Sequence, residues 1–321
     1  MTTLPYRALL PDRVWLADAS DAELERAAGH VFTRLSDGAL AVLVKTGRLT
    51  GIDRVATARR IVDGFAARVR DRFALDVATE VDRPQICDLP PGATRTLLPH
   101  HDGGHCSFLT APAGDGPPRR RALTHDAFTT TNAHKVYQGL LLREAGDGLS
   151  LTSYFDLVHL LVDAWGHQRG APAQLPALLT WYQGHVDAAI DRVAGRGYLA
   201  IGAQLGARGL ARDAAIHHAR ATLELDGVPH AVDDLADAAA RETLGVSFAE
   251  LLARHAVLAP SETGDLLIGH NLFAWHGGVE GGRGRDILPM CVTATPTGPA
   301  YERWLAEHWA RFFARATAAA A

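Results

Sequence analysis

Short apolar segments bounded by proline- and glycine-rich turns most limit the fold of this chain. Residues 74–152 contain several such runs, rich in Thr, Val and Leu, and similar runs return over residues 263–295. Short strands separated by turns are typical of a sheet or barrel. The sequence therefore predicts a mainly β core.

Segments with helical periodicity surround this core. Residues 21–73 carry apolar residues at three- and four-residue spacing, so we expect flanking helices here, the first capped by Asp21. Residues 154–256 show the same spacing and are predicted to form a helical insertion. A last amphipathic helix is expected over residues 300–319. We interpret residues 1–321 as one α+β domain. No internal repeat is visible, so a solenoid or propeller is not expected.

Composition and charge limit the classes of partner. The 321-residue chain has a net charge of -4, so no excess of basic residues favours binding to nucleic acid or to an anionic membrane. A small molecule is the expected partner. The odd number of cysteines (Cys87, Cys106 and Cys291) favours reduced thiols, and no secretion signal or membrane-spanning run is visible. We therefore expect a cytoplasmic protein.

A cluster of possible metal ligands follows one apolar strand. The segment LLPHHDGGHCSFL places three histidines and one aspartate within six residues. His100 and Asp102 are one residue apart, so on an extended chain their side chains point to the same side. His276, in the distant segment FAWHGG, would complete a facial triad of two histidines and one carboxylate. An isolated His-x-Asp pair is common on surface turns, so this prediction depends on agreement with other motifs.

An arginine at the start of an apolar strand is the second feature that indicates a binding site. Arg285 follows the glycine-rich turn GGVEGGRG and enters the apolar strand ILPMCVT. A buried guanidinium is costly unless it has an anionic partner, and a carboxylate can accept two of its hydrogen bonds. The sequence therefore predicts a carboxylate near Arg285.

Taken in order, these motifs resemble those of the taurine dioxygenase and clavaminate synthase-like family of 2-oxoglutarate-dependent oxygenases. That family has a His-x-Asp strand, a glycine-rich turn with a hydroxyl residue, a helical insertion, an Asn-containing strand with the distal histidine, and then an arginine. The corresponding residues here are His100-His101-Asp102, then Ser150 or Thr152 in REAGDGLSLTS, then Asn271 and His276, and finally Arg285.

The resemblance covers residues 95–155 and 263–295, with two departures. Met290 replaces the second arginine of the family pattern. The interval from His276 to Arg285 is also short, so Arg283 is an alternative anchor for the co-substrate. The glycine-rich turn lacks the usual threonine position, which leaves both hydroxyl residues, Ser150 and Thr152, open.

The resemblance implies a double-stranded β-helix, or jelly roll, that binds Fe(II), 2-oxoglutarate and dioxygen. Arg285 would pair with the C5 carboxylate of 2-oxoglutarate, and the insertion over residues 154–256 would act as a lid. The implied reaction oxidises a C–H bond of a small polar substrate, most simply by hydroxylation, with release of succinate and CO2. An amino acid or a natural-product intermediate is the expected substrate.

Three other functions remain open. The overlapping triplet His101-Asp102-Gly103 also fits the pattern of radical halogenases of the same class, in which chloride replaces the carboxylate ligand. A jelly-roll metalloenzyme that does not use 2-oxoglutarate would keep the three metal ligands without a role for Arg285. A binding protein without catalytic activity would have no tight iron site.

Four further polar residues are candidate substrate contacts. Gln138 and His134 lie on a strand expected beside the metal and could face the cavity or belong to the barrel wall. His105 could contact substrate or be solvated on its turn, and Asn271 precedes the distal histidine. Trp275 alternates to the face opposite His276 and is expected in the core.

Overall fold

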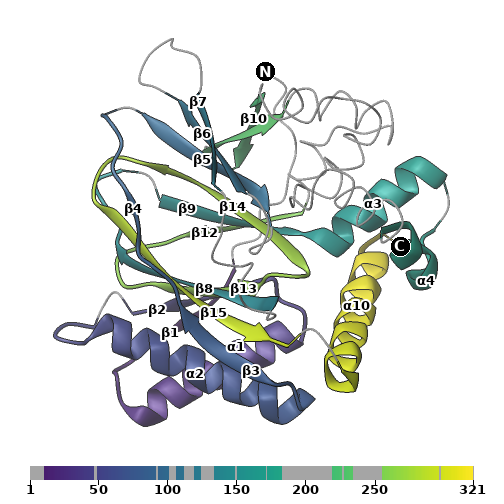
Figure 1. Ribbon diagram of the computed structural model, residues 1–321, viewed down its shortest axis with the longest axis horizontal. Helices are drawn as coiled ribbons and strands as arrows, with labels where there is room; N and C mark the ends of the chain where they lie inside the picture. The colour runs from purple at the N-terminus through teal and green to yellow at the C-terminus, as the bar shows by residue number, and fades with distance from the viewer. Residues whose placement is uncertain are drawn as a thin grey trace.

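Two large β-sheets and several helices make up the fold (Figure 1). The computed structural model describes residues 11–46, 49–91, 93–100, 106–111, 119–123, 134–148, 150–170, 172–182, 219–225, 228–233, 255–295 and 298–320. Figure 1 shows the two sheets one above the other, with two long helices beneath the lower sheet. The predicted mixed fold with a β core is confirmed at this level. The jelly-roll arrangement of the strands stays a prediction.

The lower sheet contains seven strands in the order β1-β2-β13-β8-β15-β3, and β4 pairs with β15. Among the described strands of this sheet, β1 and β2 run parallel and the other pairs are antiparallel. The bounds are β1 (Asp12–Trp15), β2 (Ala41–Lys45), β3 (Val77–Val81), β4 (Gln85–Cys87), β8 (His134–Glu144), β13 (Leu266–His270) and β15 (Arg285–Ala294).

The upper sheet contains six antiparallel strands in the order β12-β9-β14-β5-β6-β7. The chain passes from this sheet to the lower one through the short turn between β14 and β15. The bounds are β5 (Thr94–His100), β6 (Cys106–Ala111), β7 (Arg119–Leu123), β9 (Ser150–Asp156), β12 (Ala256–Pro260) and β14 (Ala274–Gly281). A separate hairpin joins β10 (Ala219–Leu225) to β11 (Val228–Asp233).

The helices α1 (Asp21–Ser36) and α2 (Arg54–Phe73) cover the lower sheet (Figure 1). The N-cap of α1 is Ser20, whose side chain accepts a hydrogen bond from the backbone N–H of Glu23, so the expected cap at Asp21 is wrong by one residue. Asp53 caps α2 in the same way. Within the described ranges, none of the helices combines the length and the hydropathy that a membrane span requires.

Two predictions of purely helical segments are wrong in part. Residues 41–45 (AVLVK), within the region expected to be helical, form the fully buried strand β2. In the expected helical insertion, α3 (Leu157–Arg169) and α4 (Leu175–Tyr182) occur, but so do β10 and β11, and strands β9 and β12 overlap its two ends. A short run that is apolar on both faces has no period-two alternation, so periodicity alone does not separate such a strand from a helix.

The last helix, α10 (Pro299–Ala320), packs against an aromatic cluster at the end of β13. His308 stacks on Phe273 with ring centroids 5.5 Å apart, and its Nδ1–H donates to the carbonyl of Trp304 at 2.8 Å. His270 lies within the same cluster and donates from Nε2 to the carbonyl of Leu35. Both imidazoles are buried, which anchors α10 and α1 to the same strand.

Burial of these two histidines predicts a loss of stability in mild acid. Burial lowers the pKa of His308 from 6.5 to about 4 and lowers that of His270 as well. Because the pKa of each histidine is lower in the folded state than in the unfolded state, the unfolded chain takes up protons first as the pH falls. The folded protein is therefore most stable above pH 6.5 and loses stability as the pH falls toward 4. A shift of this size corresponds to about 3 kcal/mol. The free energy of unfolding in urea, measured across this pH range, should depend less steeply on pH in His308→Leu than in the wild-type protein. It should keep the wild-type pH dependence in His167→Leu, whose histidine is exposed. The same pH dependence in His308→Leu and wild type would contradict the assignment.

A glycine on β8 permits the close pairing of β8 with β15. A Cβ added at Gly139 would overlap the backbone carbonyl of Met290. Gly139→Ala should therefore lower the free energy of unfolding by about 2 kcal/mol, measured by urea denaturation. Gly166 is the matched control, because it is exposed on α3 with no heavy atom within 4 Å of an added Cβ. Gly166→Ala should raise the free energy of unfolding by roughly 0.5 to 1 kcal/mol.

Candidate functional site

Strand pairing places two of the predicted metal ligands opposite one another. The register of β14 with β5 pairs His276 with His100. Residues directly opposite in antiparallel strands lie on the same face of the sheet, with Cα atoms about 4.5 to 5.5 Å apart. The backbone therefore brings residues 100 and 276 together. Asp102, the alternative ligand His101 and His105 lie outside the described residues.

His276 lies in a buried polar group formed by three strands from both sheets. Its Nε2 atom is 2.8 Å from Nε2 of Gln138 on β8, and Tyr154 on β9 donates its hydroxyl hydrogen to Oε1 of Gln138 at 3.0 Å. The Tyr154 ring also lies near the imidazole, with centroids 5.9 Å apart. All three side chains are at least 96% buried, since their exposed fractions are 2%, 4% and 0%. This group joins the two sheets at the predicted metal ligand.

These contacts define the protonation state of His276. The amide nitrogen of Gln138 can only donate, so Nε2 of His276 accepts and its proton lies on Nδ1. The hydrogen bond from Tyr154 to Oε1 orients the amide this way round. Neutral imidazole is the form that binds metals. The lone pair of Nε2 that would coordinate a metal now accepts the Gln138 hydrogen bond, so metal binding at this atom requires the amide to release it. Within the described ranges, which break between residues 100 and 106, no cluster of three or more metal-binding side chains occurs.

One face of β14 extends from His276 toward the charged residue Glu280. His276, Gly278 and Glu280 share this face, because side chains alternate along a strand. The register with β9 is regular here and sets Tyr154, Thr152 and Ser150 opposite them in turn. Thr152 is buried, and Gly278 adds no side chain between His276 and Glu280. The side-chain position between the histidine and the glutamate is therefore empty on this strand.

Arg285 already has a carboxylate partner within the chain. Its Nη1 atom forms an ion pair and hydrogen bond with Oε2 of Glu280, and both side chains are more than nine-tenths buried. A side chain of the protein therefore supplies the anion that a buried Arg285 requires, while binding of the co-substrate by Arg285 stays a prediction. The alternative anchor, Arg283, is exposed on the turn between β14 and β15, where its backbone N–H donates to Asp147 at 2.6 Å.

The remaining predicted residues have other surroundings. Asn271 is fully buried and donates from Nδ2 to the carbonyl of Lys135 at 2.8 Å, which links the end of β13 to β8. His134 is the first residue of β8 and pairs in register with Ala294, and Ser150 pairs with Glu280. Trp275 is buried in the apolar core.

Two residues of this site, Tyr154 and Glu280, were missed in the sequence. Alternation along LTSYFD places Tyr154 on the same face as Thr152, and alternation along HGGVE places Glu280 with His276, so the signal was present. Gly269 explains how the tyrosine ring fits, because a Cβ there would lie 2.5 Å from Cε1 of Tyr154. A glycine at this point of β13 lets the ring approach Gln138.

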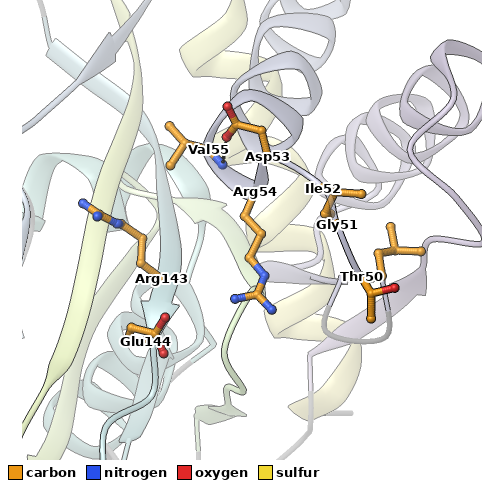
Figure 2. Close-up of a pocket in the computed structure, with 9 residues that line it drawn as sticks. Thr50, Gly51, Ile52, Asp53, Arg54, Val55, Arg143 and Glu144 are labelled. Atoms are coloured by element: carbon orange, nitrogen blue, oxygen red, sulfur yellow. Dashed lines mark hydrogen bonds between the residues drawn. The ribbon is translucent and has the colours of Figure 1, made fainter.

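A pocket of about 520 Å³ lies elsewhere, between the start of α2 and the end of β8 (Figure 2). Figure 2 shows Arg54 reaching from α2 toward the end of β8, where Glu144 lies. None of the predicted site residues lines this pocket, whose lining is Leu49, Thr50, Gly51, Ile52, Asp53, Arg54, Val55, Arg143 and Glu144. This pocket is therefore separate from the candidate site.

Comparison with solved structures finds similarity to a taurine dioxygenase, a non-heme iron oxygenase and the protein AAD-2. A taurine dioxygenase from Burkholderia xenovorans has 11% identity and a TM-score of 0.35, over 98% of this chain and 99% of that chain. The non-heme iron oxygenase OrfP, in complex with Fe, succinate and (3R,4R)-dihydroxy-L-Arg, has 13% identity and a TM-score of 0.34, over 84% and 80%. AAD-2, in complex with Mn(II) and N-oxalylglycine, has 10% identity and a TM-score of 0.37, over 93% and 100%.

Comparisons at the level of sequence find no similar family or protein. No protein-family model matches the chain, and no curated protein matches it.

The bond from Tyr154 to Gln138 leads to a prediction about His276. Tyr154→Phe removes the donor that orients the amide, so the free energy of unfolding should fall by about 1 kcal/mol. The ring ¹⁵N signals of His276 should also show a smaller fraction of the Nδ1–H tautomer. Tyr301→Phe is the control, because the described residues give that hydroxyl no hydrogen bond, and it should change neither quantity. An unchanged His276 spectrum in Tyr154→Phe would refute the link.

Proposed function

We propose that this chain is a non-haem Fe(II)- and 2-oxoglutarate-dependent oxygenase that hydroxylates a C–H bond of a small polar substrate. The observation that carries the proposal is the register of His276 with His100, at a buried polar group that keeps the His276 imidazole neutral. An amino acid or a natural-product intermediate fits the net charge of -4 and the absence of a basic surface in the sequence.

The residues fit a bound iron ion as far as they are described. The His276 imidazole is neutral, and its Nε2 can bind a metal once the Gln138 amide releases it. His100 lies opposite on the same face, and Asp102 follows two residues later in the chain. We infer that these three residues are the metal ligands. When bound, Fe(II) supplies the oxidising chemistry with dioxygen, and 2-oxoglutarate is consumed to give succinate and CO2.

The chain's own residues would hold the organic co-substrate along β14. Four strand residues, roughly 13 Å between Cα atoms, separate His276 from Glu280 and its partner Arg285. Gly278 leaves this stretch without a side chain, and the Thr152 hydroxyl lies beside it. We infer that Arg285 binds the distal carboxylate and that Thr152 or Ser150 contributes a hydroxyl. Burial excludes water from the same region.

One observation favours a second candidate function. Arg285 is already paired with Glu280, which supports a metalloenzyme that does not use 2-oxoglutarate. Such an enzyme would keep the histidine and aspartate ligands, while Arg285 and Glu280 would serve only as a buried ion pair between β14 and β15. Binding of 2-oxoglutarate separates the two candidates.

An anaerobic titration tests the proposal. Metal-free protein should bind one equivalent of Fe(II), and added 2-oxoglutarate should then produce the weak visible charge-transfer band of a chelated iron complex. His276→Ala and Asp102→Ala should lose the band because each removes a ligand, whereas Arg285→Gln should retain iron and weaken 2-oxoglutarate binding at least about tenfold. His167→Ala, an exposed histidine on α3, is the matched control.

The other outcomes decide against the proposal in different ways. Iron binding without the band would favour the metalloenzyme that does not use 2-oxoglutarate. A chain that binds no iron would not be an oxygenase of this class.

A further inference from the structure

The ion pair between Glu280 and Arg285 has a consequence for the proposed co-substrate. The exposed fractions of the two side chains are 9% for Arg285 and 6% for Glu280, so water screens the pair weakly. Glu280 lies on the face of β14 that carries His276, two alternations further along the strand. The carboxylate of Glu280 is therefore at the end of the site where the distal carboxylate of 2-oxoglutarate would bind.

A second carboxylate at this guanidinium meets an opposing charge. The ligand carboxylate would either share Arg285 with Glu280, which places two carboxylates against one buried guanidinium, or displace Glu280. Displacement breaks the buried ion pair between Glu280 and Arg285, which is unfavourable. Both routes reduce the free energy gained when a dicarboxylate binds.

We propose that Glu280 is a specificity-determining residue that competes with the distal carboxylate of the co-substrate for Arg285. The inference rests on the proposed function, because it takes Arg285 as the co-substrate anchor. Glu280 acts through Arg285, so its effect falls on ligands that carry a distal carboxylate. The affinity of the wild-type protein for 2-oxoglutarate, relative to an analogue without the distal carboxylate, is consequently lower than it would be if Arg285 had no competing carboxylate from Glu280.

Affinity measurements with two matched ligands test this inference. 2-Oxopentanoate has the same five-carbon 2-oxo acid chain as 2-oxoglutarate but lacks the distal carboxylate. Both ligands are titrated calorimetrically into the anaerobic, Fe(II)-loaded full chain, with wild type and Glu280→Gln. The variant is nearly isosteric and removes only the competing charge. It should tighten 2-oxoglutarate binding by about tenfold or more and leave 2-oxopentanoate within about twofold.

A merely structural role for Glu280 gives a different result. Equal shifts for both ligands, or weaker 2-oxoglutarate binding in Glu280→Gln, would overturn the inference while leaving the proposed function in place. If wild type and Glu280→Gln bind iron but neither binds 2-oxoglutarate, the proposed function fails, and the inference fails with it.

Glu280→Asp guards against misfolding of the first variant. It keeps the charge but withdraws it from Arg285 by one methylene, so it should tighten 2-oxoglutarate binding less than Glu280→Gln does. Thermal unfolding with and without Fe(II) checks that each variant is folded. If Glu280→Gln does not fold, Glu280→Asp decides alone: tighter 2-oxoglutarate binding supports the competition, and unchanged or weaker binding contradicts it.

Discussion

The hydrogen bonds of Gln138 join the two sheets at the point on which the candidate site depends. A buried amide must satisfy both its oxygen and its nitrogen, and here Tyr154 and His276 do so from the opposite sheet. The consecutive strands β8 and β9 and the distant strand β14 therefore have one relative position at this point. A buried polar group of this kind restricts the sheets more narrowly than apolar contacts alone, because hydrogen bonds are directional.

The register of β14 carries this restriction along the sheet. A slip of one residue would turn His276 away from the face that it shares with Glu280 and would bring Trp275 onto it. The buried apolar surface of Trp275 on the other face opposes such a slip. The core residue thus stabilises the position of the polar one, and both are consequences of the same alternation.

Much of this arrangement could be predicted from the sequence where one physical rule dominated. Alternation along β14 placed His276 and Trp275 on opposite faces, and the glycine-rich turn marked the passage to β15. The strand β2 was missed because its five residues are buried on both faces, which removes the alternation that identifies a strand. The pairing of His276 with His100 was expected from a resemblance, since no local rule specifies which strands become neighbours.

Arg285 shows how far such rules extend. The cost of a buried guanidinium requires an anionic partner, and this requirement alone is met equally by a ligand or by a side chain. Glu280 meets it from within the chain, five residues earlier, on the face that alternation assigns to His276. Charge balance in the interior therefore determines that a carboxylate lies beside Arg285, and the competition between a resident and an incoming carboxylate becomes a property of the site itself.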